Sequence, residues 1–491
     1  MPANILIFLT DQHRYDTMGF NGNSVVRTPV LDGVAAEGMV FDRFYTPTAI
    51  CTPARGSLLT GMAPFRHQLL ANYERNVGYK EELDPQQFTF GHALRDAGYN
   101  VGLVGKWHVG ARLTAADYGF DGEDFRGWHN PVDHPAYEAY LADHGYPPDA
   151  ISRPMRGRFP NGNEGNLLAA CLEQPVEATF EYFLAEQAID RLRRYCTDQR
   201  DGRPIFLATH FFGPHLPYIV PAHYLDLYDP DDIELPGSVA ETFAGKPPVQ
   251  ANYSAHWAFD TMSEAESRKL IAAYWGYVTM IDEQIGRIVD VARELGVWDD
   301  STVFFSADHG EFTGAHRLHD KGPAMYEDIY HLPCVVRTPG GTAGRTDRYA
   351  TLIDFTATIL DVAGLDPTLA VDGRSLLPIL RGEQVDWSDE LVLEFHGHHF
   401  PYPQRALLAG GMKLVVNPES VNELYDLRRD PDELHNRYHH PELREVRDAM
   451  TQRLYHRLRE RGDNFYHWMS TMYDVGPKDY DPTLSSFERT P

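Results

Sequence analysis

The chain has 491 residues, a formal net charge of -27 and a pI near 5.2. Its 43% hydrophobic and 23% charged residues are the balance of an ordinary soluble globular protein, and its length predicts one large domain with a smaller one. The acidity argues against a nucleic-acid-binding protein and against a peripheral membrane protein. An anionic substrate would therefore need a locally basic pocket.

The sequence has no apolar run long enough to span a membrane. Its start, MPANILIFLTDQH, lacks the basic region and the cleavage site of a signal peptide, so we expect NILIFLT to form a first buried strand. The four cysteines, Cys51, Cys171, Cys196 and Cys334, include no CxxC pair. This sparse set predicts a protein without a disulfide framework, in a reducing, cytoplasmic compartment.

Short β-rich apolar segments alternate with helical patterns along most of the chain. We expect strands at Asn4–Thr10, Tyr99–Val104, Ile205–Thr209, Thr302–Ala307 and Cys334–Arg337. We expect helices at Leu31–Glu37, Phe88–Ala97, Pro175–Cys196 and Glu264–Leu295. This alternation predicts an α/β fold in which helices cover both faces of a largely parallel sheet.

The composition changes after Leu380, where a polar stretch precedes four closely spaced strand patterns and a helical pattern. We therefore expect a large domain over residues 1–385 and a small α+β domain over residues 386–464. Within the large domain, residues 111–174 show few clean patterns and predict a long insertion that shapes a cleft. The aromatic tail, residues 465–491, is expected to pack on the body or on a neighbouring subunit, which favours a homodimer or homotetramer.

The segment ICTPARGSLLTG, residues 50–61, places a cysteine at a predicted helix start. Thr52 is the expected N-cap, Pro53 suits the first helical position and Gly61 suits a left-handed stop. Cys51 would then lie where free backbone N–H groups and the helix dipole favour a negative charge. A buried apolar cysteine, a thiolate nucleophile and a metal ligand all remain open for this position.

Polar residues directly follow two of the predicted strands. Asp11 and Gln12 come after the first strand, and Asp308 and His309 come after TVFFSA. Ligands bind at the carboxyl ends of strands in parallel α/β sheets, so we expect these groups to meet there. Either aspartate alone would favour a simple helix cap, but two carboxylates with an imidazole favour a site for a hard or borderline cation.

Basic residues lie in three further loops. Lys106 and His108 alternate in GKWHVG, so in extended backbone both side chains would face the same side. His215 lies between two prolines in FLATHFFGPHLPY, and these prolines stiffen the loop that holds it. Lys321 follows in DHGEFTGAHRLHDKG. Taken singly, such residues are more often solvated than catalytic.

Together these segments resemble the type I sulfatases of the alkaline phosphatase superfamily, near its phosphonate monoester hydrolases. CTPAR, residues 51–55, matches the family's C-x-P-x-R motif, and GSLLTG continues it. GKWH, PHLP, DHG and the downstream lysine follow in the family's order, as do VDGRSLLP and ELYDLRRDPDEL, so the resemblance extends to about Asn436. It implies an alkaline-phosphatase-like three-layer sandwich with a large, mostly parallel sheet and a small C-terminal α+β domain.

The resemblance implies that a formylglycine-generating maturation enzyme converts Cys51 to formylglycine. One hydroxyl of the hydrated aldehyde would attack the sulfur of a sulfate monoester, and the other would expel sulfate from the sulfated hemiacetal. The implied ligands of one divalent metal are Asp11, Asp308, His309 and residue 51, with Gln12 as a further candidate. Gln12 stands where many sulfatases have an aspartate and His309 where many have an asparagine, so Mn²⁺ competes with Ca²⁺.

The same resemblance assigns a role to each basic residue. Arg55 would orient the formylglycine hydroxyls, while Lys106 and Lys321 would hold the sulfate oxygens as fixed cations. His215 or Lys321 would protonate the leaving alkoxide, and His108 would be the base that opens the hemiacetal.

Two other functions compete with that of a promiscuous sulfatase acting on aryl or similar sulfates. A phosphonate monoester hydrolase or phosphodiesterase would share the formylglycine, but such relatives tend to lack Lys106 and His108. A silent fold that only binds sulfated ligands would not need the full set of site residues.

Two weaker features concern the pocket. Asn72 matches by offset a polar pocket residue of some relatives, and FHGHHFPYP, residues 395–403, looks like a metal-binding tract but is better interpreted as a loop at the cleft mouth.

Overall fold

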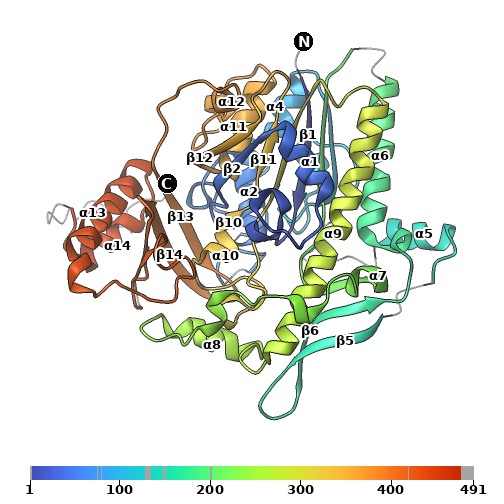
Figure 1. Ribbon diagram of the computed structural model, residues 1–491. Coiled ribbons are helices and arrows are strands. Elements are labelled where there is room, and N and C mark those ends of the chain that lie inside the picture. Colours follow the sequence, from blue (N-terminus) through green and yellow to red (C-terminus); the bar gives the residue numbers. More distant parts are fainter. Residues whose placement is uncertain are drawn as a thin grey trace.

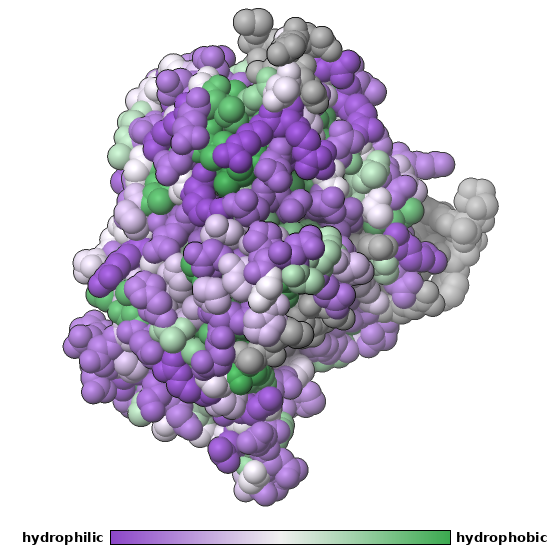
Figure 2. Space-filling view, turned by 90° about the vertical axis from the view of Figure 1, so that its right-hand side faces the viewer, coloured by the Kyte–Doolittle hydropathy of each residue, from purple (hydrophilic) through white to green (hydrophobic). Residues whose placement is uncertain are grey.

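The computed structural model describes residues 3–476 except residues 75, 79, 126, 128–133, 148–150, 199–201 and 419. A large sheet lies between two groups of helices, and a small sheet with two helices lies beside it (Figure 1). Among the described residues, no helix is both long and apolar enough to cross a bilayer. The face that lies to the right in Figure 1 is mostly hydrophilic, with hydrophobic residues in limited patches (Figure 2).

Within the described residues, the large sheet has nine strands in the order β10-β2-β11-β9-β1-β7-β3-β4, with β12 paired to β2. Its strands are β1 (Asn4–Thr10), β2 (Met39–Tyr45), β3 (Asn100–Lys106), β4 (Asp124–Phe125), β7 (Ile205–His210), β9 (Ser301–Ala307), β10 (His331–Leu332), β11 (Val335–Arg337) and β12 (Gly344–Thr351). Strand β1 is parallel to β7 and β9, β3 is parallel to β7, and β11 is antiparallel to β9 and β2. The prediction of a largely parallel sheet is therefore confirmed.

Strand β1 is buried on both faces, which explains its nearly continuous apolar sequence. Leu6 and Phe8 pack into the core beneath α1, α6 and α9, and the alternate residues Ile5, Ile7 and Leu9 pack into the core beneath α2, α4 and α11. These helices are α1 (Pro29–Glu37), α2 (Cys51–Thr60), α4 (Phe90–Asp96), α6 (Phe180–Asp198), α9 (Glu264–Glu294) and α11 (Leu352–Val362). The predicted helix at Pro175–Cys196 is instead a 3₁₀ turn at Val176–Ala178 followed by α6.

The region predicted to be a patternless insertion contains regular structure. Helix α5 (Pro135–Asp143) precedes a hairpin of β5 (Ile151–Arg158) and β6 (Glu164–Leu172), and β6 pairs in parallel with β8 (Tyr218–Pro221). Figure 1 shows this hairpin projecting from the lower right of the body. Most of β5 is solvent-exposed and the pairing contains irregular steps, so no clean apolar alternation marks it in the sequence.

The C-terminal part contains an antiparallel sheet in the order β13-β14-β15-β16. Its elements are β13 (Glu390–Gly397), β14 (Pro401–Ala409), β15 (Met412–Val416), β16 (Glu423–Asp426), α13 (Arg444–Arg461) and α14 (Phe465–Met472). Phe465 and Met469 of α14 pack in the same core as α13 and the sheet, so the first part of the predicted tail lies on this chain's own body. Residues 477–491 lie outside the described residues, and the oligomeric state stays a prediction.

Candidate active site

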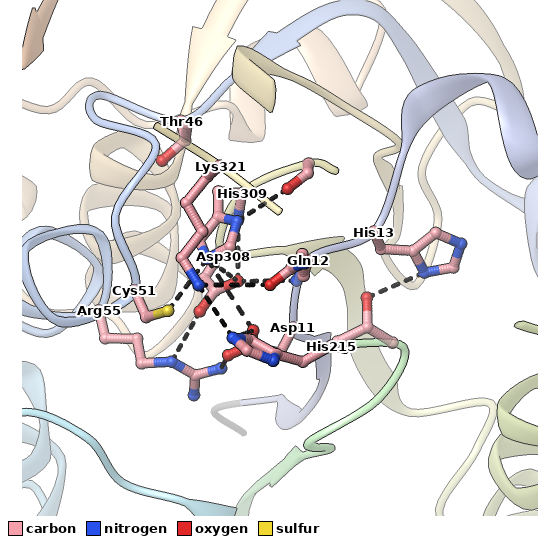
Figure 3. A network of polar contacts seen from close by, with 12 residues as sticks. Asp11, Gln12, His13, Thr46, Cys51, Arg55, His215, Asp308, His309 and Lys321 are labelled. Carbon is pink, nitrogen blue, oxygen red and sulfur yellow. Dashed lines mark hydrogen bonds and ion pairs between the residues drawn. The ribbon is translucent and has the colours of Figure 1, made fainter. Parts of the chain in front are cut away.

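Four neighbouring strands end at one edge of the large sheet, in the order β9, β1, β7 and β3. Asp308 follows β9, Asp11 follows β1, the loop with His215 follows β7, and Lys106 ends β3. Helix α2 begins at the same place with Cys51, so residues far apart in the sequence converge there (Figure 3). The expectation that the polar residues after the strands meet at the carboxyl edge agrees with this arrangement.

Helix α2 starts two residues earlier than predicted. Its N-cap is Ile50 rather than Thr52, and the buried Thr52 hydroxyl has no hydrogen-bond partner among the described residues. The Asn72 side chain supplies the capping interaction instead, because its Oδ1 accepts the Thr52 backbone N–H at 3.0 Å. Asn72 Nδ2 lies 3.9 Å from the Cys51 sulfur, and Gly61 ends the helix with φ 67° as predicted. Asn72 therefore lies beside the reactive position.

Cys51, Asp11, Asp308 and His309 are buried, and each offers one ligand atom within 4.8 Å of the others. His309 Nδ1 lies 2.8 Å from the Gly310 carbonyl, to which it donates, so Nε2 faces the cluster, 3.0 Å from the Cys51 sulfur. Asp11 Oδ1 is buried and accepts no hydrogen bond from any described residue. An unpartnered carboxylate oxygen, a second carboxylate and an imidazole nitrogen fit a hard or borderline divalent cation.

Arg55 and Lys106 neutralise the two aspartates from the side. Arg55 Nε lies 2.9 Å from Asp308 Oδ2, and its Nη2 lies 2.9 Å from Asp11 Oδ2. Lys106 Nζ lies 2.7 Å from the same Asp11 oxygen. Burial would raise the pKa of Asp11, but the charges of Lys106 and Arg55 hold that pKa well below its ordinary value. Asp11 is therefore ionised, with Oδ1 free to bind a cation.

Glu311 orients Gln12. The Gln12 amide nitrogen donates to Glu311 Oε2, so the amide oxygen points towards Lys321, whose Nζ lies 3.3 Å away. Glu311 Oε1 in turn accepts the Thr313 backbone N–H at 3.0 Å. The sequence prediction named Gln12 as a candidate metal ligand but missed Glu311, although it directly follows the DHG motif. The structure places the Gln12 amide oxygen beside Lys321 at the edge of the cluster.

His215 and Lys321 form a pair in which Lys321 carries the proton. His215 Nδ1 donates to the Leu216 carbonyl at 2.6 Å, so its Nε2 accepts from Lys321 Nζ at 2.9 Å. Burial and the Lys321 charge hold the pKa of His215 well below its ordinary value, which keeps the ring neutral. Burial would lower the pKa of Lys321, but Asp320, Cys51 and Asp11 raise it. Lys321 is therefore a buried cation next to residue 51.

His108 reaches the site by a different route from the predicted one. Strand β3 ends at Lys106, and His108 has φ 50°, so the two side chains do not alternate along an extended strand and that prediction is wrong. The buried His108 ring contacts the Tyr73 ring edge to face at 5.1 Å. Burial and the charges of Lys106 and Arg55 hold the pKa of His108 well below its ordinary value. It is a neutral imidazole, which can accept a proton.

The cluster opens into a pocket of about 570 Å³. His215 and Lys321 of the cluster line it, and three outer segments contribute to its wall: the β5–β6 hairpin, the segment after α8 (Pro248–His256) and the β13–β14 turn. The residues from these outer segments are Asn166, Leu167, Leu168, Trp257, Phe259, His398 and His399. The predicted insertion and the stretch at residues 395–403 therefore both contribute to the pocket wall.

Comparisons with known proteins agree with this geometry. The profile of the family described as Sulfatase matches residues 3–365, and that described as N-sulphoglucosamine sulphohydrolase, C-terminal, matches residues 314–460. An arylsulfatase of Clostridium perfringens is 28% identical, with 95% of this chain and 96% of that protein covered. The multifunctional alkaline phosphatase superfamily protein PehA of Trinickia caryophylli is also 28% identical, with 95% and 98% covered.

Among solved structures, the phosphonate monoester hydrolase of Agrobacterium radiobacter matches with a TM-score of 0.77 and 25% identity, covering 94% of this chain and 96% of that one. This likeness confirms the alkaline-phosphatase-like α/β fold with a small C-terminal α+β part. The Sulfatase profile spans well over half of the sequence. The chain therefore belongs to the sulfatase family, within the alkaline phosphatase superfamily, and is a sulfuric ester hydrolase.

Proposed function

We propose that this protein hydrolyses sulfate monoesters, aryl sulfates or similar, after its Cys51 has been converted to formylglycine. The observation that carries this proposal is the convergence of Cys51 with two buried carboxylates, an imidazole and three buried cations at one sheet edge. The cations create the locally basic pocket that an anionic ester requires in a chain of net charge -27.

The residues present fit the two groups that sulfatases generally use. Asp11, Asp308, His309 and the modified residue 51 would hold one divalent metal, which would lower the pKa of a bound hydroxyl and polarise sulfuryl oxygens. The carboxylates suit Ca²⁺, and the nitrogen of His309 makes Mn²⁺ the alternative. A formylglycine hydrate would supply two hydroxyls on one carbon, one to attack sulfur and one to release sulfate.

The surrounding side chains would position and neutralise the ester. Arg55 fixes both aspartates through its two ion pairs, which keeps Asp11 Oδ1 directed at the cluster. Lys106 and Lys321 would stabilise the charge on the equatorial oxygens of the transition state. Lys321 would give its proton to the leaving alkoxide, because the proton of neutral His215 is committed to the Leu216 carbonyl. The neutral His108 would remove the proton of the second hydroxyl.

Phosphonate monoester or phosphodiester hydrolysis is the second candidate. It is supported by the likeness to the phosphonate monoester hydrolase structure and by Gln12, which stands beside Lys321 where many sulfatases have an aspartate. The buried Lys106 and His108 favour sulfate esters. The transition states of sulfate ester and phosphonate ester hydrolysis nevertheless resemble each other, because both carry anionic equatorial oxygens around the central sulfur or phosphorus. We therefore expect measurable phosphonate hydrolysis as a side activity.

The test compares kcat/KM for p-nitrophenyl sulfate and p-nitrophenyl phenylphosphonate with one preparation of matured, metal-loaded enzyme. A higher value for the sulfate supports the assignment, and a clear preference for the phosphonate would overturn it. A panel of sulfate monoesters with aryl, sugar and alkyl alcohols would then identify the preferred alcohol.

A further inference from the structure

A second group of metal-ligating side chains lines the same pocket, outside the catalytic cluster. Glu74, His398 and His399 each present one ligand atom, and these atoms lie within 4.8 Å of one another. We propose that Glu74, His398 and His399 bind a borderline transition-metal ion such as Zn²⁺ at the mouth of the active-site pocket.

The surroundings of His398 suit a metal ligand. Its side chain is buried, and its Nδ1 lies 3.1 Å from the Tyr253 hydroxyl. In the described part of the chain, no residue hydrogen-bonds to its Nε2. Metal-binding histidines commonly use one ring nitrogen for such a supporting bond and the other for the ion. Burial, followed by the charge of Lys321, holds the pKa of His398 well below its ordinary value, so the ring is neutral.

Glu74 provides a carboxylate that is only half satisfied. Its Oε1 accepts the His399 backbone N–H at 2.9 Å and lies 3.0 Å from His399 Nδ1. Its Oε2 is buried and has no hydrogen-bond partner among the residues that the structure describes. A buried, unpaired carboxylate oxygen is costly unless a donor or a cation meets it. An ion bound between Oε2 and the two imidazoles would satisfy it.

The two loops that form this group are tied together without an ion. His398 and His399 lie in the turn between β13 and β14, and Glu74 lies in the segment after Asn72. The Asn76 side chain donates to the His399 carbonyl at 3.1 Å, in addition to the Glu74 contacts. Preorganised ligands lose less entropy on binding a cation.

The ligand set distinguishes this group chemically from the catalytic cluster. Two imidazoles and one carboxylate suit Zn²⁺, Ni²⁺ or Cu²⁺, whereas Ca²⁺ and Mg²⁺ prefer sites made of oxygen ligands. Without an ion, the Nδ1–H of the half-exposed His399 donates to Glu74 Oε1. A bound ion would displace this proton to solvent and take Nδ1 as a ligand. The catalytic cluster contains two carboxylates, so Ca²⁺ should load it without filling the second site.

An ion at this position would narrow the entrance to His215 and Lys321, which line the same pocket. On the proposed function, zinc should raise KM for a bulky aryl sulfate more than it lowers kcat. This consequence rests on sulfate ester hydrolysis, whereas the binding of zinc does not.

The experiment counts bound zinc by equilibrium dialysis of tag-free, Ca²⁺-loaded protein against zinc chloride. We expect one equivalent of zinc in the parent protein, and at least about tenfold weaker zinc binding in His399→Ala and Glu74→Gln. His435→Ala removes an exposed histidine elsewhere and should bind zinc like the parent. Asp308→Asn, which damages the catalytic cluster, should keep this equivalent.

Equal zinc binding by the parent, His399→Ala and Glu74→Gln would overturn the proposal, as would the absence of a bound equivalent in the parent. Loss of zinc in Asp308→Asn with retention in His399→Ala would place the ion in the catalytic cluster and would also overturn it. Because the count needs no turnover, a protein that hydrolyses no sulfate ester but binds zinc in this pattern would refute the proposed function and support the second site.

Discussion

Two parts of the active site are built in opposite ways: the carboxyl edge of the large sheet, which carries the Cys51 cluster (the edge), and the side of the pocket formed by the hairpin, the segment after α8 and the β13–β14 turn (the wall). At the edge, Asp11 and Asp308 directly follow the neighbouring parallel strands β1 and β9, so the sheet order brings them together, and Cys51 joins them at the start of α2. At the wall, Leu168, Trp257 and His399 come from a hairpin, the end of a helix and a turn that share no sheet edge. The catalytic cluster therefore lies on elements with strong local sequence signals, while the pocket wall is formed by segments without a shared sheet edge. Substitutions at the edge should therefore have larger effects than substitutions at the wall.

Replacing Cys51 with serine should abolish multiple turnover and leave the fold intact. A serine could attack sulfur once but would have no second hydroxyl to release sulfate, so kcat should fall by at least about 10³-fold. Steady-state kinetics with p-nitrophenyl sulfate measure the loss, and mass spectrometry should find sulfate on residue 51. Cys196→Ser, a partly exposed cysteine on α6, is the matched control and should keep full turnover. Undiminished turnover in Cys51→Ser would contradict the role of residue 51.

Replacing Arg55 with methionine should destabilise the metal-free protein by about 3–5 kcal/mol, because it strips a buried cation from Asp11 and Asp308. Urea unfolding in the presence of EDTA measures the free energy. The control is Arg153→Met, whose pair with Asp226 is solvent-exposed and should change stability by less than about 1 kcal/mol. Equally small losses in both variants would show that the edge is not held by this buried network.

Replacing Glu181 with glutamine should flatten the pH dependence of stability. Glu181 Oε1 accepts the Gly213 backbone N–H and the Tyr277 hydroxyl, and Gly213 in turn accepts the Asp11 N–H, so Glu181 supports the loop that carries His215. Burial raises the pKa of Glu181 to about 7, although those donors oppose it. Its stabilising contribution is therefore complete below its ordinary pKa of 4.5 and is lost as the pH rises through about 7.

Urea unfolding at pH 5 and pH 8 measures this effect. From pH 5 to pH 8, the free energy of unfolding of the parent should fall by on the order of 3 kcal/mol more than that of Glu181→Gln. The glutamine keeps the accepting oxygen but cannot ionise. Parallel curves for the two proteins would contradict this account of the loop.

The smallest expected effect concerns the wall. Replacing Trp257 with alanine should raise KM for an aryl sulfate by several-fold, about 1 kcal/mol, while kcat stays nearly constant. The indole lines the pocket wall, where we expect the alcohol rather than the sulfate to lie. Trp468→Ala, on the exposed side of α14, should leave both constants unchanged. A fall in kcat with constant KM in Trp257→Ala would break the division between edge and wall.

Sequence patterns predicted the elements that are buried on both faces, such as β1 and β9, because continuous apolar runs leave few alternatives. They missed β2 and β12. Strand β2 carries Asp42 and Arg43 in its middle, and most of the first part of β12 is exposed, so neither shows a clear apolar pattern. The β5–β6 hairpin was not predicted for the same reason, because its pairing is irregular and most residues of β5 are exposed.

Motif residues were placed in the site as the resemblance implied, but their local geometry was not predictable from spacing. His108 takes a left-handed backbone conformation, and Asn72 rather than Thr52 caps α2. Glu311 orients Gln12 through a contact across almost 300 positions of sequence, which no local pattern encodes. Such contacts depend on the sheet order that places the strand ends side by side.

The central claim is that residue 51 acts only after conversion from cysteine. Preparations made with increasing amounts of a formylglycine-generating enzyme would be analysed by mass spectrometry of the peptide around residue 51 and by the rate of sulfate release. The account predicts that specific activity rises in proportion to the converted fraction and extrapolates to zero for unmodified Cys51. Full activity in a preparation that contains only the thiol would contradict it.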